Sequence, residues 1–156
     1  MVFHIVAVGR VRHLALREAC DDYRRRANHY FNIDIQEIAT PRGARPDTET
    51  RRREAVGLLK AIPGNAVAIA LSREGEQEDS SGFAERMARW QREARDVTFV
   101  IGGASGLDES VFDRCDGRLS LSSWTLPHEL ARLVLLEQIY RAGSILRGEP
   151  YHKGSR

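Results

Sequence analysis

The chain lacks the features that would assign it to a membrane or a secretory pathway. No apolar run in it approaches the roughly 18 residues that a transmembrane helix needs. The opening residues, MVFHIVAVGR, hold too short an apolar stretch for a signal peptide and have no cleavage site. We therefore expect a cytoplasmic protein with no membrane partner.

Cysteine and lysine are also scarce. Cys20 and Cys115 are the only cysteines and follow no metal-binding spacing, which excludes a disulfide scaffold and predicts no metal site. A net charge of +2 excludes a strongly basic nucleic-acid-binding surface. All but two of the 24 basic residues are arginine, whose planar fork suits phosphates, although codon bias explains the excess more simply. Binding to RNA would therefore depend on local patches.

Strand-like and helix-like segments alternate along the chain. The patterns predict strands over residues 1–8, 33–38, 66–71, 97–101 and 118–121, and helices over 14–30, 49–60, 80–93, 109–114 and 127–147. Thr48 and Asp108 are the expected N-caps of the helices that follow them. Such alternation is typical of an α/β fold with a parallel sheet of about five strands flanked by helices. A length of 156 residues fits one domain, residues 1–156.

The stretch from Val97 to Leu126 organises the rest of the chain. Its apolar strand stops at Gly102-Gly103, with Gly106 three residues on, and a second strand leads into the loop 121–126. In open parallel sheets ligands bind at the carboxyl ends of strands, so we interpret both loops as walls of one pocket. The glycines do not form the dinucleotide fingerprint, because Ile101 stands where its first glycine should be.

The last helix, residues 127–147, is apolar on two sides. One stripe holds Leu126, Leu130, Leu133 and Tyr140, and the other holds Leu135, Ile139 and Leu146. Its own sheet can cover one side, and a second subunit would cover the other, which predicts a homodimer. Glu137 falls within the first stripe, with Arg141 four residues on, a spacing that suits both a salt bridge and a functional pair.

The tail after this helix is the other candidate site. Tyr151 offers a ring for stacking on a base, His152 titrates near neutral pH, and Lys153 adds charge. A frayed end without function is the alternative.

Four motifs together resemble one family. They are IGG-x-x-GL at 101–107, LS-x-x-TLPH at 121–128, Glu-x-x-Tyr-Arg-Ala at 137–142, and Pro-Tyr-His at 150–152. The family is that of the ribosomal RNA pseudouridine N3-methyltransferases, a branch of the trefoil-knotted SPOUT methyltransferases, and the resemblance covers essentially the whole chain. It implies a knotted single-domain fold, a homodimer with shared sites, S-adenosylmethionine as cofactor, and 23S ribosomal RNA as substrate.

The resemblance also implies roles for residues. Backbone and side chains of the strand-end loops would bind the cofactor: Leu71, Gly102, Gly103, Gly106, Leu121, Ser122, Ser123, Trp124, Thr125 and Leu126. The catalytic residues would be His152, Glu137, Arg141 and Tyr151, with His152 and Glu137 as candidates for the base that removes the proton. Tyr151, His152 and Lys153 would hold the RNA base, which would approach the pocket near Glu137 and Arg141.

The chain departs from the family pattern at four places. Ala104-Ser105 replaces Pro-Glu, Gly143 replaces Trp, and Lys153 replaces Arg. Two other functions therefore stay open. One is a non-catalytic RNA- or ribosome-binding protein that retains the fold, and the other is a different nucleotide-dependent enzyme, such as one that uses a nicotinamide cofactor.

Overall fold

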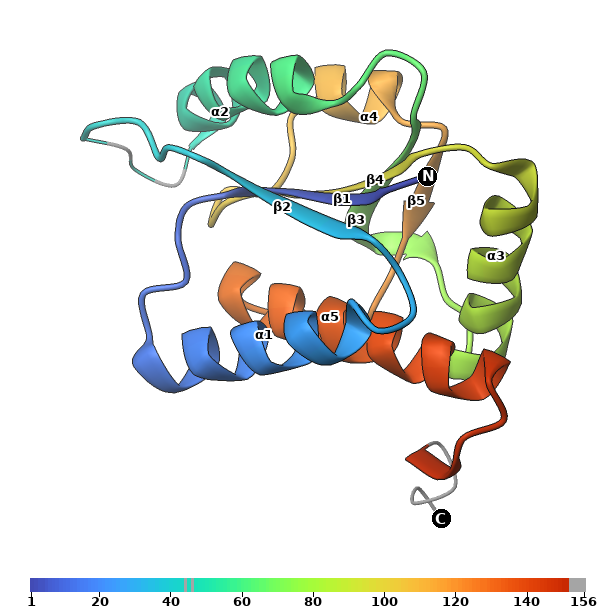
Figure 1. Ribbon diagram of the computed structural model, residues 1–156. Coiled ribbons are helices and arrows are strands. Elements are labelled where there is room, and N and C mark those ends of the chain that lie inside the picture. The colour runs from blue at the N-terminus through green and yellow to red at the C-terminus, as the bar shows by residue number, and fades with distance from the viewer. Residues whose placement is uncertain (44, 46, 152–156) are drawn as a thin grey trace.

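Helices and strands alternate in the computed structural model, which describes residues 1–43, 45 and 47–151 (Figure 1). The strands are β1 (Phe3–Val8), β2 (Ile33–Ile38), β3 (Val67–Glu76), β4 (Val97–Ile101) and β5 (Gly117–Leu119). The helices are α1 (Leu14–Ala27), α2 (Thr48–Ala61), α3 (Ser80–Glu93), α4 (Glu109–Arg114) and α5 (His128–Leu146). All strand pairs are parallel, and the order in the sheet is β2-β1-β4-β3-β5. The predicted α/β class is confirmed.

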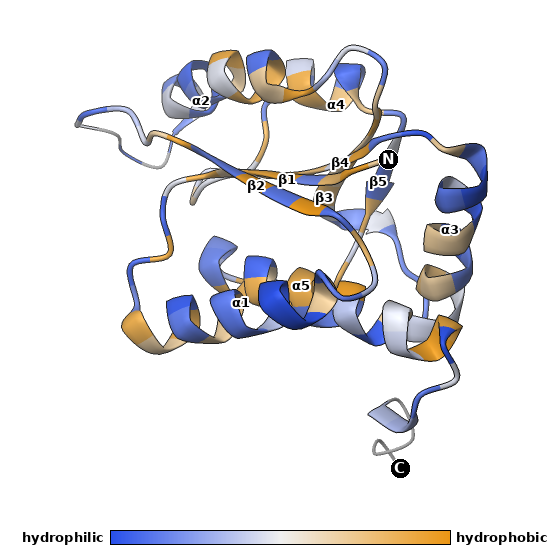
Figure 2. Ribbon diagram, in the orientation of Figure 1, coloured by the Kyte–Doolittle hydropathy of each residue, from blue (hydrophilic) through white to orange (hydrophobic). Residues whose placement is uncertain are grey.

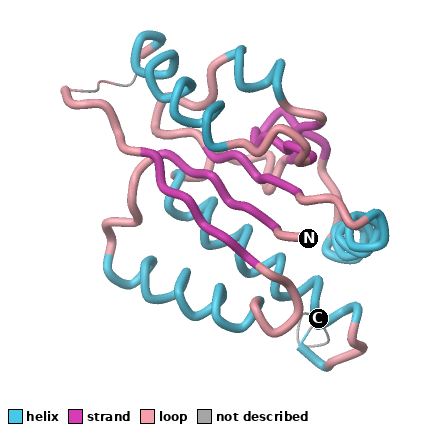
Figure 3. Tube along the Cα trace, turned by 45° about the horizontal axis from the view of Figure 1, so that its top comes forward, coloured by secondary structure: helices cyan, strands magenta, loops and turns pink. Residues whose placement is uncertain are grey.

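The helices cover both faces of this sheet. In Figures 1 and 3, α2 and α4 lie on one side of the strands, and α1 and α5 lie on the other. Figure 2 shows apolar residues concentrated along the strands between these layers. A parallel strand with helices on both faces must be apolar on both faces, and all five residues of β4 are accordingly buried.

Several boundaries shift by one to three residues from the sequence prediction, as at the end of α1, and two differences affect the region of the pocket. Asp47, and not Thr48, is the N-cap of α2, because the Asp47 Oδ1 accepts a 2.7 Å hydrogen bond from the backbone N–H of Thr50. Strand β3 continues to Glu76, five residues beyond its predicted end. Leu71 and Glu76 both pair with Leu119, so residues 72–75 form a bulge that leaves the sheet and returns to it.

Helix α5 packs along α1 and α3 within the same chain. Leu135, Leu136 and Ile139 are fully buried in the core that these three helices share with the sheet. The premise that one apolar side of α5 needs a second subunit for cover is therefore wrong, because α1 and α3 supply the cover. The outer face of α5 keeps Leu130, Val134, Glu137 and Arg141 only partly buried.

Candidate functional site

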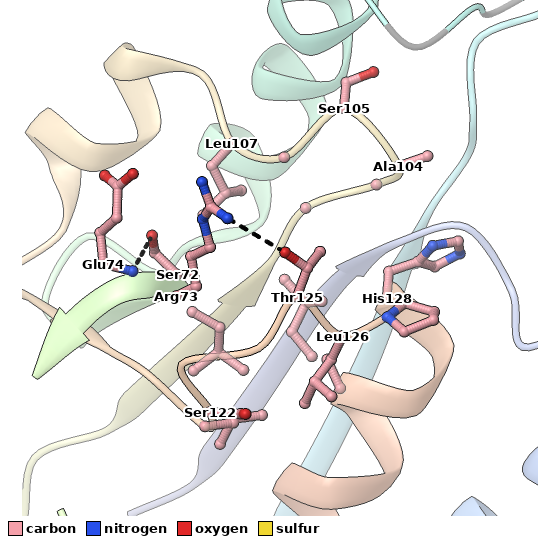
Figure 4. A pocket seen from close by; sticks show the side chains of 18 of the residues that line it. Ser72, Arg73, Glu74, Ala104, Ser105, Leu107, Ser122, Thr125, Leu126 and His128 are labelled. Atoms are coloured by element: carbon pink, nitrogen blue, oxygen red, sulfur yellow. Dashed lines mark hydrogen bonds between the residues drawn. The ribbon is translucent and has the colours of Figure 1, made fainter. Parts of the chain in front are cut away.

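A pocket of about 880 Å³ opens at the carboxyl ends of β3, β4 and β5 (Figure 4). This volume lies within the range of small-molecule sites. Its two main walls are the loop after β4, residues 102–107, and the loop before α5, residues 121–127. The two loops that the sequence predicted as walls of one pocket are thus brought together.

The loop after β4 depends on its glycines. The Gly106 backbone N–H donates a 3.0 Å hydrogen bond to the Gly103 carbonyl, which closes a tight turn. Gly106 has φ of +78°, a conformation that other residues rarely adopt. A Cβ on Gly102 would lie 2.7 Å from the Gly106 carbonyl oxygen, so no side chain fits there. Asp108 then caps α4 as predicted, because its Oδ1 accepts from the Ser110 N–H.

Side-chain hydrogen bonds hold the opposite wall in place. The Ser120 hydroxyl donates to the Ser122 carbonyl at 2.9 Å, and the Trp124 N–H donates to the Ser122 Oγ at 3.0 Å. Arg73, which the bulge of β3 carries outward, reaches the Thr125 Oγ1 at 3.5 Å (Figure 4). The Trp124 side chain is 80% exposed, so it stands at the mouth of the pocket.

Nearly every residue predicted to bind the cofactor lines this pocket. The set comprises Leu71, Gly102, Gly103, Gly106, Leu121, Ser122, Trp124, Thr125 and Leu126. Ser123 is absent from the described lining. Further residues outside the predicted cofactor set also line the pocket, among them Arg51, Ser72, Arg73, Leu107 and His128. Ser72 and Arg73 directly follow the predicted end of a strand, which put them on the expected ligand side of the sheet, and the bulge of β3 carries them to the pocket. His128 directly follows the predicted loop, so its position in the sequence could have indicated it.

A buried carboxylate lies beneath the glycine loop. Glu54, on α2, is only 4% exposed and accepts a hydrogen bond from the backbone N–H of Gly103. Its Oε2 has no hydrogen-bond partner among the described residues. Burial raises the pKa of Glu54 above its ordinary value, and the Gly103 N–H opposes this only in part. Because Glu54 lies four residues before the buried Leu58, helical spacing could have placed it on the inner face of α2.

Three of the predicted catalytic residues meet on α5 and the tail. Arg141 donates from Nε and Nη2 to the Glu137 Oε1, at 2.9 and 2.6 Å. The Tyr151 hydroxyl donates to the same oxygen at 3.1 Å, and the Arg141 guanidinium lies 4.9 Å from the centre of the Tyr151 ring. Burial raises the pKa of Tyr151, and the hydrogen bond to Glu137 raises the pKa of Arg141. The predicted Glu137–Arg141 salt bridge therefore forms, and the same pair also contacts Tyr151 of the tail.

This cluster and the pocket are separate within one chain. Glu137, Arg141 and Tyr151 are not among the described residues that line the pocket. Tyr151 instead packs on α1 and α5, with its ring 4.6 Å from that of Tyr140 and its hydroxyl 3.1 Å from that of Tyr23. His152 and Lys153 lie outside the described residues.

The described part of the chain holds neither a cluster of metal ligands nor a helix that could span a membrane. No group of three or more histidine, cysteine, aspartate or glutamate side chains there could hold a metal ion. Within the same residues, no helix is both long and apolar enough to cross a membrane.

Comparisons with known proteins agree with the fold and the motifs. The family model described as "Predicted SPOUT methyltransferase" matches residues 1–152. Two relatives are named ribosomal RNA large subunit methyltransferase H. The one from Gemmatimonas aurantiaca is 46% identical over 96% of this chain and 97% of its own length. The one from Anaeromyxobacter sp. (strain Fw109-5) is 44% identical over 98% of this chain and 100% of its own length.

Solved structures of methyltransferases share the fold at low sequence identity. A probable methyltransferase from Bordetella pertussis superposes with a TM-score of 0.57 at 15% identity, covering 91% of this chain and 93% of its own. A probable methylase family protein from Haemophilus influenzae gives 0.55 at 10% identity, covering 96% of this chain and 69% of its own. With the family model and the relatives matching along almost its whole length, the chain belongs to the ribosomal RNA large subunit methyltransferase H family of SPOUT methyltransferases.

Proposed function

We propose that this protein transfers a methyl group from S-adenosylmethionine to N3 of a pseudouridine in 23S ribosomal RNA. The observation that carries the proposal is the pocket itself, which gathers all but one of the predicted cofactor residues at the ends of β3, β4 and β5. The relatives support it, because their names give ribosomal RNA of the large subunit as the substrate of a methyltransferase.

The residues of the pocket fit such a cofactor. Leu71, Leu121 and Leu126 supply apolar walls for an adenine ring. The glycine loop brings backbone N–H and C=O groups to the surface with no side chain in the way. Arg51 and Arg73 add positive charge that suits the carboxylate of the methionine part. When bound, S-adenosylmethionine supplies a sulfonium whose methyl group is already activated for transfer. The protein must then align the acceptor nitrogen and assist the loss of its proton.

For the acceptor side we propose the group of Glu137, Arg141, Tyr151 and His152. It does not line the pocket of its own chain, so we propose a homodimer in which the tail of one subunit completes the pocket of the other. The partly buried outer face of α5, with Leu130, Val134 and the Glu137–Arg141 pair, is the proposed contact.

Mixed dimers test the shared site. Ser72→Trp should fill the pocket, and Tyr151→Ala should disable the tail, so each variant alone should be inactive. Mixing the two should restore roughly a quarter of wild-type activity, because half of the dimers are mixed and each has one intact site. No recovery after verified subunit exchange would mean that pocket and tail act within one chain.

Mass mapping of ribosomal RNA tests the reaction. RNA from a deletion strain should lack one methyl group on a pseudouridine, and the purified protein with S-adenosylmethionine should restore it. Calorimetry with S-adenosylmethionine and with a nicotinamide dinucleotide separates this reaction from the nicotinamide alternative. A protein that binds ribosomes but methylates nothing would be the non-catalytic alternative.

We further propose that residues 1–156 act as a single domain, since one sheet carries the elements that line the pocket. A ribosomal substrate also supports the cytoplasmic location proposed from the sequence.

A further inference from the structure

A second cavity lies on the other side of the glycine loop. It has a volume of about 360 Å³ and sits at the carboxyl ends of β1, β2 and β4, where the larger pocket uses β3, β4 and β5. Gly103, Ala104, Ser105 and His128 line both spaces. One loop and one side chain of α5 therefore separate this cavity from the proposed cofactor site.

The rim of the cavity carries positive charge. Arg10, Arg12 and Arg45 line it, and all three are exposed residues. The Arg10 Nε lies 3.8 Å from the Glu37 Oε2, a loose pair that leaves its side chain 88% exposed. Three guanidinium groups around one opening suit the oxygens of a phosphate.

The loop that carries Arg10 and Arg12 is held in place by α5. The Glu129 carboxylate accepts from the backbone N–H of Arg12 at 3.1 Å and of His13 at 3.2 Å. These two hydrogen bonds lower the pKa of Glu129 and keep its carboxylate charged. The bond from Arg12 has the larger effect. Arg132 donates to the Gly9 carbonyl at 2.7 Å. Arg10 and Arg12 are thus presented from a fixed backbone, which lowers the entropic cost of binding.

The inner end of the cavity is acidic. Glu54 lines it, nine-tenths or more buried, with one oxygen bonded to Gly103 and the other without a partner in the described structure. A buried carboxylate oxygen without a donor is costly, and an N–H or O–H from a ligand would offset that cost. An anion alone would not be attracted to this end, whereas a group with donors would be.

We propose that this cavity receives a nucleotide of the RNA substrate, with its phosphate on Arg10, Arg12 and Arg45 and its base or ribose directed toward Glu54. A nucleotide combines the negative charge that the rim attracts with the N–H and O–H donors that the inner end lacks. The shared wall of Gly103–Ser105 then sets this nucleotide beside the methyl donor. The inference rests on the proposed function and adds a second contact for the RNA to the acceptor group of Glu137, Arg141, Tyr151 and His152.

The test compares two double variants. Arg10→Ala with Arg12→Ala removes two of the three rim arginines, neither of which lines the larger pocket, and Arg89→Ala with Arg92→Ala on α3 is the matched control. Binding to large ribosomal subunits is measured against salt concentration, and binding of S-adenosylmethionine is measured by calorimetry. The rim variant should bind subunits at least tenfold more weakly, with a salt dependence lower by about 0.7 in log–log slope for the loss of one single-strand phosphate contact. Its cofactor affinity should stay within twofold of the control.

A third variant tests the inner end. Glu54→Gln keeps an oxygen for the Gly103 N–H but offers an amide where the carboxylate lay, so kcat/KM for methylation should fall at least tenfold at unchanged cofactor affinity. Rim and Glu54 variants that bind and methylate subunits like wild type would overturn the inference. A rim variant that loses cofactor affinity instead would reassign the cavity to the methionine end of the cofactor. A wild-type protein that binds subunits with the expected salt dependence but does not methylate them would contradict the proposed function alone.

Discussion

At the scale of single residues, the contact between Gly103 and Glu54 is the most sensitive point of the site. A Cβ on Gly103 would lie 2.7 Å from the Glu54 Oε1 and 3.1 Å from the Val8 Cγ1. Both neighbours are buried, so an added methyl group has no free space to enter. The glycine is required by the packing beneath the loop, independently of any ligand above it.

Gly103→Ala should therefore push Glu54 aside and shift the loop. We expect a loss of stability of about 1–3 kcal/mol, the usual cost of overpacking, and a loss of cofactor affinity of at least tenfold. Urea unfolding and calorimetry measure the two effects. Gly64→Ala is the control, because nothing lies within 4 Å of the added atom. Equal behaviour of the two variants would remove the loop from the site.

Glu54 should also make stability depend on pH. Burial raises the pKa of its carboxyl in the folded state above the ordinary value of 4.5. From about pH 4.5 upward the unfolded chain loses this proton first, so the folded state binds more protons and its stability falls as the pH rises. Glu54→Gln removes this decline, so the difference in unfolding free energy between variant and wild type should grow with pH.

Urea titrations across that range, with the exposed Glu49→Gln as control, would measure the effect. Parallel stability curves for wild type and Glu54→Gln would show that Glu54 titrates normally.

The sequence alone predicts those residues whose role depends on near neighbours. Asp108 is predicted as a cap because the helix it starts follows at once, and Gly102 and Gly106 because a strand ends there. Glu54 is not predicted, because its importance comes from Gly103, which is distant in sequence. Helical spacing could place Glu54 on the inner face of α2, but its contact with Gly103 is decided by tertiary packing.

At the scale of elements, α5 organises the ends of the strands through Arg132. This side chain is 2% exposed and donates to the Glu37 Oε1 at 2.6 Å and to the Gly9 carbonyl at 2.7 Å. One residue thus ties α5 to the ends of both β1 and β2.

Arg132→Met should keep the apolar stem and lose both hydrogen bonds. It leaves the Gly9 carbonyl and the Glu37 carboxylate without this donor, for which we expect a cost of about 2–3 kcal/mol. Chemical denaturation measures it, with the exposed Arg92→Met on α3 as control. A stability equal to that of the control would mean that water replaces the guanidinium at no cost.

The elements were predictable to different degrees. The sequence predicts α3 and β4 to the residue, because α3 has a clear helical period and β4 is a short apolar, β-branched run. It misses the bulge in β3, because Glu76 returns to the sheet only through its pairing with Leu119. Ser72 and Arg73 reach the pocket through that bulge, so their place depends on a contact between distant strands.

At the scale of the whole molecule, assembly is the main expectation to test. The sequence pattern of α5 suggested two faces for burial, but α1 and α3 cover the face with Leu135 and Ile139. Charging those residues would unfold the chain and say nothing about a dimer. The partly buried Val134 on the outer face is the informative position.

Val134→Glu should convert a micromolar dimer into monomers, because it places an unpaired charge in the proposed contact. Sedimentation velocity measures the change. Val56→Glu on α2 is the control, since Val56 is 70% exposed and lies on the opposite face of the sheet. A wild-type protein that sediments as a monomer at high concentration would refute both the dimer and the shared site. The knot implied by the resemblance likewise stays a prediction, because strand order alone does not determine how the chain threads.

The contact between Tyr30 and Gly143 limits how the parts of this protein can be exchanged. A Cβ on Gly143 would lie 2.3 Å from the Tyr30 ring, and the Tyr30 hydroxyl donates to the Glu149 carboxylate, which raises the pKa of Tyr30 to about 12. The resemblance puts a tryptophan at position 143. The Tyr30 ring therefore occupies space that a side chain at this position of α5 would need. A chimera that took α5 from a relative with a large residue there would expel Tyr30 and release its hold on the tail. Positions 30 and 143 must therefore be exchanged together when such a chimera is built.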